Sequence, residues 1–321
     1  MKPEEIHRYF INVLENRVPE RTKLVEILMD TLFMEKRAIY RRLNGEVPFS
    51  FTDVVRIAEK LNISLHSFIY TGHVRKDRFE LAFVEYTDMS EEDYKLWENY
   101  ISLIDSAKND PESEFAESSN MLPISIYGQY KSISKYYLFK YQYLLHGLEK
   151  KVSFGDLEVS ERYYKNDKSY FDASKKIATN TYIWDYMLFQ YLATDIRYFV
   201  DINLISAHDV ELIKKDLLSL LDYIEQIALT GRFAETGNSA TFYISDLNFD
   251  SNYSYLRTNN LCVSLVRTFI LNSVNSTSNN SYIRIKDWIH SLKKSSTLIT
   301  QSGAEYRADF LKKQREIILE L

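Results

Sequence analysis

The chain has 321 residues, of which 45% are hydrophobic and 26% are charged, and its formal net charge is −5. This length and ordinary composition predict a globular protein of two or three domains with a sizeable core. Cys262 is the single cysteine, which excludes a disulfide framework or a cysteine-rich zinc site within one chain and favours a reducing compartment. The sequence has no signal peptide and no uninterrupted run of 18 apolar residues, so we expect a cytoplasmic protein that does not contact membranes.

Short amphipathic helices are predicted for the first part of the chain. Residues 4–15 and about 22–32 carry apolar side chains at helical spacing, and Thr22 is suited to cap the second of these helices. A third helix is expected over 36–44, and Gly45 is suited to end it because glycine tolerates a positive φ. The second and third helices, joined by a tight turn, form a candidate helix-turn-helix.

The third predicted helix divides into two arcs when its residues are placed at about 100° intervals. One arc, at positions 38, 39, 42 and 43, is expected to pack, although Arg42 is an unusual member of it. The opposite arc holds three cations, a phenol and an amide, and no carboxylate: Lys36, Arg37, Tyr40, Arg41 and Asn44. Arg or Lys can bridge O6 and N7 of guanine, whereas Asn and Tyr suit phosphates or base edges. The arc is therefore a candidate for entering a DNA major groove.

Two more short helices are predicted before residue 70. Ser50 and Asp53 have the spacing of a capping box at the start of the fourth, and a fifth follows over 64–69. This order, together with the string AIYRRLNGEVPFSFTDVVRIAEKLNISL from residue 38, resembles the DNA-binding domain of phage-repressor and Cro-type regulators over about residues 4–70. The resemblance implies that Lys36, Arg37 and Tyr40 lie where the family reads bases, and that Asn44 lies where it holds a backbone phosphate.

Three positions depart from the family pattern. Met29 replaces a residue that is usually small, Phe33 replaces a turn residue that is often glycine, and Arg42 replaces a residue that is usually apolar. A helix-turn-helix can also serve as a docking surface for another protein. An adaptor that uses the first 70 residues for protein binding is therefore the alternative function.

The two parts of the chain differ in charge. Residues 1–74 hold 11 Lys and Arg against 10 Asp and Glu, about +1, whereas residues 75–321 hold 29 against 35, about −6. The acidic excess lies outside the predicted DNA-binding part, where it limits indiscriminate phosphate binding. Because +1 is modest, DNA affinity should depend on a local cationic patch and on two copies binding together, so we expect a homodimer.

The remainder of the chain is predicted to be rich in helices. Residues 73–118 are interpreted as a linking helical segment that ends in a loop over 109–120, and a buried helix is expected over 181–200. Apolar residues spaced by four and three over 210–229 form a short seam, for which internal packing is favoured over dimerisation. Alternation near 240–274 predicts a small antiparallel sheet of about three strands. The expected fold class is mainly α, with a helix-turn-helix domain and an α-rich α+β domain.

The sequence nominates no catalytic chemistry. It has no GxGxxG, P-loop, GxSxG or HExxH, and Cys262 lies in a predicted strand as a small buried side chain. We therefore expect no enzyme, no metal and no cofactor, although a catalytic domain built from scattered residues is a third hypothesis. Tyrosine is abundant, and six tyrosines are close together in the middle of the sequence: Tyr127, Tyr130, Tyr136, Tyr137, Tyr141 and Tyr143. They could form an amphipathic pocket or a partner surface, or they could lie at the edges of the core. We favour the edges of the core.

The sequence thus predicts a sequence-specific, DNA-binding transcriptional regulator. A helix-turn-helix domain is expected over 1–72, the linking segment over 73–118, and a sensor or dimerisation domain over 119–321. The expected partners are double-stranded DNA, a second copy of the chain, and a small-molecule or protein effector.

Overall fold

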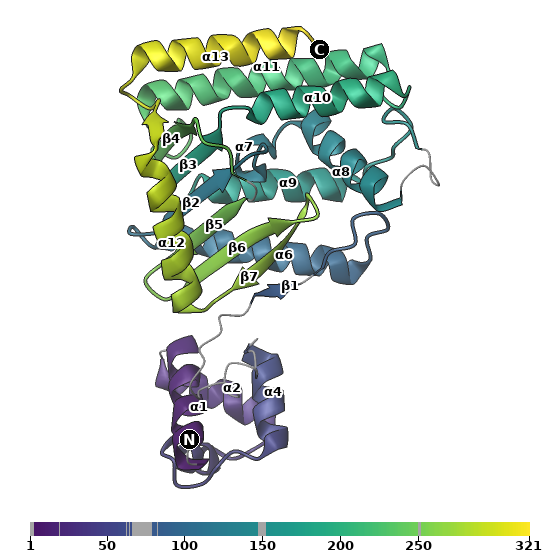
Figure 1. The fold of residues 1–321 in the computed structure, drawn as a ribbon. Coiled ribbons are helices and arrows are strands. Elements are labelled where there is room, and N and C mark those ends of the chain that lie inside the picture. The colour runs from purple at the N-terminus through teal and green to yellow at the C-terminus, as the bar shows by residue number, and fades with distance from the viewer. Residues whose placement is uncertain are drawn as a thin grey trace. The chain divides into compact units, whose positions relative to one another are not determined.

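The computed structural model describes residues 3–18, 20–61, 63, 65, 79–81, 83–146, 152–249 and 252–321. The chain divides into two compact units, Met1–Lys76 and Asp77–Leu321 (Figure 1). Most of the predicted fifth helix, 64–69, lies outside the described residues.

The described part of the first unit contains four helices. They are α1 (Pro3–Arg17), α2 (Arg21–Leu32), α3 (Lys36–Leu43) and α4 (Phe51–Leu61). Each turns one apolar stripe inward, and the unit thereby has a core of its own, formed by Phe10, Ile11, Leu14, Leu24, Val25, Leu28, Leu32, Ile39, Leu43, Phe49 and Ile57.

The ends of these helices agree with the sequence in part. The capping box of α4 is confirmed: Ser50 N donates to Asp53 Oδ2 at 2.9 Å, and Asp53 N donates to Ser50 Oγ at 3.1 Å. Thr22 is not a cap, because α2 begins one residue earlier and no side chain caps it. Phe33 ends α2 in the left-handed conformation, with φ 54° and ψ 44°.

The described part of the second unit is built on one mixed sheet of eight strands in the order β1-β7-β6-β5-β2-β3-β4-β8. β2, β3 and β4 pair in parallel, and the other pairs are antiparallel. The strands are β1 (Glu80–Leu81), β2 (Glu114–Ser119), β3 (Thr179–Asp185), β4 (Ser239–Ser245), β5 (Tyr253–Arg257), β6 (Cys262–Thr268), β7 (Asn272–Ser276) and β8 (Ser296–Leu298). The expected fold class, mainly α with a small antiparallel sheet, is therefore wrong in the size and the pairing of the sheet.

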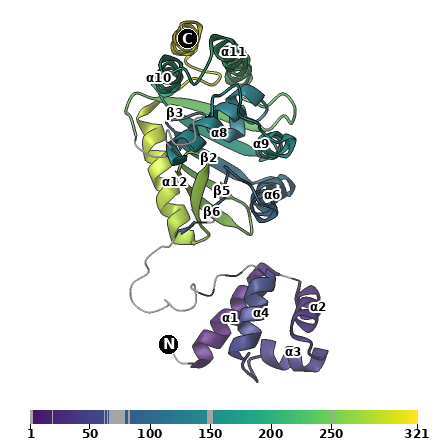
Figure 2. The same cartoon turned by 90° about the vertical axis from the view of Figure 1, so that its right-hand side faces the viewer.

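Helices cover both faces of this sheet (Figures 1 and 2). A smaller core lies between one face and α12 (Asn279–Lys294). The larger core lies on the other face, and seven helices contribute side chains to it. They are α6 (Glu91–Ser106), which continues into the 3₁₀ turn η1 (Ala107–Asn109), α7 (Ile124–Tyr127), α8 (Lys131–His146), α9 (Glu161–Ser174), α10 (Leu188–Asp201), α11 (Ala207–Thr230) and α13 (Ala304–Leu319).

Three segments differ from the sequence-based expectation for physical reasons. The loop expected over 109–120 contains β2, whose polar residues are paired inside the sheet. The helix expected over 181–200 overlaps β3, because Tyr182, Ile183 and Trp184 of this strand are followed closely by the apolar residues of α10. The single strand expected over 261–274 is β6 and β7, joined at Phe269 and Ile270, which both have positive φ without being glycine.

The tyrosines and the predicted apolar seam lie in the larger core. Tyr127, Tyr136, Tyr137 and Tyr141 are buried there, and Tyr130 and Tyr143 are partly buried against it. The seam residues of α11 are also buried, which confirms internal packing. None of the helices within the described ranges is both long and apolar enough to span a bilayer.

Candidate nucleic-acid interface

Helix α3 presents most of the predicted polar arc to solvent. Ile39 and Leu43 are buried in the core of the first unit and hold the helix against α2. Lys36, Arg37, Arg41 and Asn44 are exposed, while Tyr40 is half-buried and packs on the edge of the core. The structure therefore brings together three exposed cations and an amide, with the phenol beside the core.

Arg42 lies on the packing arc because it has a partner there. Its Nε is 3.8 Å from Asp53 Oδ2, and its Nη1 donates to the Ala38 carbonyl at 3.3 Å. The Arg42 and Asp53 side chains are only 19% and 11% exposed. Since Asp53 also belongs to the capping box of α4, this ion pair joins α3 to the start of α4.

Asn44 is connected to the start of α2. Arg21 Nη2 donates to Asn44 Oδ1 at 2.8 Å, and Arg21 Nη1 lies 3.7 Å from Glu15 Oε1. The bond orients the Asn44 amide so that its N–H groups stay available as donors. Sequence analysis missed Arg21. The signal that could have found it is a cation in the first turn of α2, where the helix dipole favours anions.

The cationic side chains of α3 differ in whether they form an ion pair. Arg41 Nε lies 3.3 Å from Glu46 Oε2, and both side chains are more than half exposed. Lys36 and Arg37 make no ion pair with any residue in the described ranges. An exposed ion pair contributes little to stability, so Arg41 can exchange Glu46 for a phosphate at small cost.

The comparisons with known proteins add no relative. No family model, no curated protein and no solved structure matches the chain. Helix α3 is eight residues long, about 12 Å, and a cationic helix of this size fits within a major groove.

Proposed function

We propose that the protein binds double-stranded DNA in a sequence-specific manner and regulates transcription, with α3 as its recognition helix. The observation that carries the proposal is the exposure of Lys36, Arg37 and Arg41 on a helix whose opposite side is buried in the core and packs against α2. The three-residue connection between α2 and α3 also suits a helix-turn-helix.

Each polar residue then has a distinct part in the complex. Lys36 and Arg37 lie at the N-terminus of α3, and the N-terminal residues of a recognition helix contact base edges. Arg41 and Asn44 lie toward its other end and suit the phosphate backbone, with Arg21 positioning the Asn44 amide. Tyr40 is half-buried and offers its phenol edge between these two groups.

The proposal includes a twofold dimer that acts in the cytoplasm. Residues 1–74 have a net charge of only about +1, so one copy gains limited affinity from phosphates. Two copies on half-sites about one DNA turn apart would supply the rest. Sedimentation with and without DNA tests this part, and a monomer under both conditions would contradict it.

Selection of bound sites from a random duplex pool by the full chain is the test of the main proposal. On the selected site, Lys36→Ala or Arg37→Ala should weaken binding by about 1–3 kcal/mol if the residue reads a base. The matched control is Lys60→Ala, which removes an exposed cation of α4. An equal loss on scrambled DNA would make the residue a phosphate contact.

A protein-docking function is the second candidate, and two exposed aromatic side chains favour it. Phe33 and Phe51 are 86% and 80% exposed, and aromatic residues are enriched at protein interfaces. Salt separates the two functions, because DNA affinity falls steeply as salt rises. Absence of duplex binding even at low salt would support the adaptor and overturn DNA binding.

A further inference from the structure

The second unit contains a cavity of about 160 Å³ between the sheet and α6. Its floor is the face of β2, β5, β6 and β7 that looks toward the larger core. The side chains on this floor are Glu117, Ser254, Leu265, Arg267, Ser273 and Asn275. A sheet face packed under a helix is ordinarily apolar, so this polar floor needs an explanation.

Strand register places these residues side by side. Glu117 pairs with Ser254, Ser254 with Leu265, and Leu265 with Asn275, so they form one row across four strands. Arg267 lies two residues beyond Leu265 on β6, on the same face of the sheet. Buried polar groups normally have hydrogen-bond partners, since leaving one unpaired is costly. The row therefore provides donors and acceptors for a molecule inside the cavity.

Arg267 is the cation of this floor, and Glu117 is its ion-pair partner. Its Nη2 lies 3.7 Å from Glu117 Oε1, too far for a hydrogen bond, and its side chain is 17% exposed. The guanidinium donates no hydrogen bond to any side chain or carbonyl in the described residues. A guanidinium has five N–H donors in a planar fork that matches a carboxylate. A hydrogen-bond acceptor on a bound molecule would satisfy these donors.

Glu117 does not fill that need. It is 4% exposed, and its Oε2 accepts from Ser125 Oγ at 3.3 Å. Burial raises the pKa of the Glu117 carboxyl, and Arg267 opposes the rise. An anion bound to Arg267 would favour the protonated carboxyl further, and that form can itself donate to the anion.

The walls of the cavity are aromatic. Tyr86 and Trp97 meet edge to face with ring centroids 5.5 Å apart, and Tyr100 and Tyr170 stack at 5.9 Å. Such walls suit a planar ring. An apolar cavity of about 150 Å³ holds one benzene molecule, so this volume admits a single six-membered ring with a small substituent.

We propose that this cavity binds a small aromatic carboxylate, with the carboxylate on Arg267 and the ring among Tyr86, Trp97, Tyr100 and Tyr170. The guanidinium charge selects an anion, and the aromatic walls select a ring. This inference does not depend on DNA binding by the first unit.

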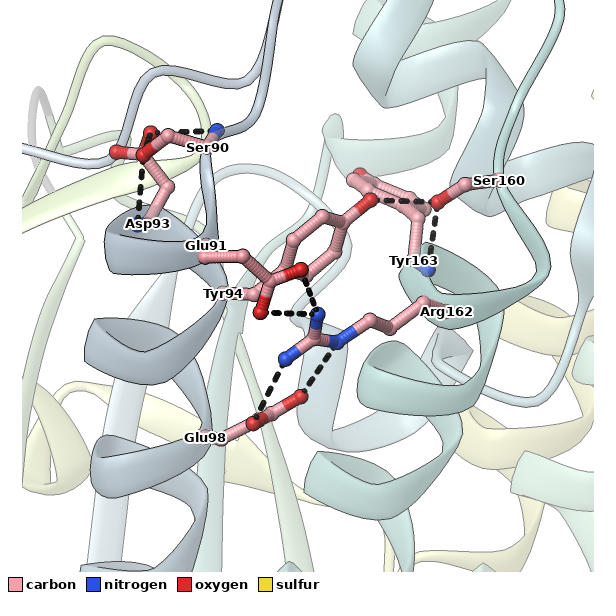
Figure 3. Close-up of polar contacts among 8 residues, drawn as sticks. All are labelled: Ser90, Glu91, Asp93, Tyr94, Glu98, Ser160, Arg162 and Tyr163. Atoms are coloured by element: carbon pink, nitrogen blue, oxygen red, sulfur yellow. Dashed lines mark hydrogen bonds and ion pairs between the residues drawn. The ribbon is translucent and has the colours of Figure 1, made fainter.

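A polar clamp holds the wall helix α6 in place (Figure 3). Arg162 of α9 donates to Glu91 at 2.8 Å and to Glu98 at 2.9 Å, and it lies over the Tyr94 ring at 4.2 Å. Tyr94 Oη and Ser160 Oγ are 2.6 Å apart. Because Leu96, Trp97 and Tyr100 of α6 line the cavity, the clamp keeps the shape of the site fixed before a ligand enters.

The test uses the full chain with benzoate as the probe and benzamide as its uncharged counterpart. Benzoate should raise the melting temperature and change Trp97 fluorescence, both saturably at millimolar concentrations, and benzamide should bind at least about tenfold more weakly. Trp97→Phe should remove most of the fluorescence change while retaining the thermal shift. Cyclohexanecarboxylate tests the ring, and it should bind more weakly than benzoate.

Two arginine variants complete the design. Arg267→Gln should abolish the preference for benzoate over benzamide, whereas Arg257→Gln removes a guanidinium of the same sheet outside the cavity and should retain it. The comparison of the two probes on the unmodified chain decides the matter even if Arg267→Gln does not fold. Equal binding of benzoate and benzamide, or no binding of either, would overturn the proposal. Uracil and adenine serve as uncharged planar rings of another class, and tighter binding of either would also overturn it.

Discussion

Phe33 combines a strained backbone with a side chain that contributes little packing. It ends α2 at φ 54° and is 86% exposed. Left-handed backbone costs an L-residue about 1–2 kcal/mol, whereas glycine adopts it freely and loses about 0.5–1 kcal/mol through its freer unfolded chain. The position of glycine in many helix-turn-helix turns therefore has a direct physical reason here.

We expect Phe33→Gly to stabilise the first unit by about 0.5–1 kcal/mol. Hydrogen exchange of the α2 and α3 amides in the full chain measures it as slower exchange. Phe33→Ala is the control, because alanine removes the ring but keeps the strain. A gain of equal size from alanine would show that the exposed ring, not the backbone, is the cause.

Asp167 of α9 is a fully buried carboxyl. Burial raises its pKa to about 7, although the Ser134 hydroxyl and nearby Arg267 oppose the shift. The folded protein thus keeps this proton up to about pH 7, whereas an unfolded aspartate releases it near pH 4. Stability is consequently lost as pH rises between these values, by roughly 4 kcal/mol at most.

Asp167→Asn should remove this loss. The variant should be more stable than the unmodified chain at about pH 8 and differ little near pH 4, as measured by urea unfolding across this range. Asp172→Asn, on the same helix, is the control of opposite sign. Burial alone would raise the pKa of Asp172, but hydrogen bonds from Lys168 and Lys175 hold it below its ordinary value, so its replacement should cost stability at the higher pH.

At the scale of elements, α3 and α4 are joined by one ion pair. Arg42 Nε is buried without a hydrogen bond, and the carboxylate of Asp53 compensates the positive charge of the guanidinium. Asp53→Ala should therefore cost about 2–3 kcal/mol, about 1 of it from the lost cap. In an Arg42→Leu background the same change should cost only about 1 kcal/mol, because no charge is stranded. Hydrogen exchange of the α3 and α4 amides reports both values, and equal costs in the two backgrounds would show that the residues are not coupled.

Elements with two agreeing local signals are the ones that sequence predicts. The capping box at Ser50 precedes an apolar stripe, and helix α4 begins there. β2 and β3 lack such agreement: the sequence of β2 is mostly polar, and the apolar residues of β3 are followed closely by those of α10. Their strand character comes from pairing with distant segments, which a local window does not contain.

The two candidate sites differ in the same way. Lys36, Arg37 and Arg41 lie within two turns of one helix, so their common face is predictable from spacing alone. The cavity in the second unit joins Val84 to Asn275 across most of the chain. Its polar floor becomes visible only when the strand register is known.

At the scale of the whole molecule, each unit has its own hydrophobic core. The first is a small helical unit with local contacts. The second depends on pairing between remote segments: Val84 N donates to Asn272 Oδ1 across 188 residues of sequence. Proteins dominated by such pairings fold more slowly than helical ones, so we expect the first unit to form earlier.

The central place of β2 has a consequence for synthesis on the ribosome. Its neighbours are β3 and β5, and Tyr255 of β5, which donates to Glu114, follows that residue by 141 positions. A nascent chain that has reached β4 thus contains all three parallel strands, whereas one edge of β2 is still unpaired because β5 has not been synthesised. An unpaired strand edge can pair with strands of other molecules. Premature termination between β4 and β5 should therefore yield an insoluble polypeptide, even though most of the residues have already been translated.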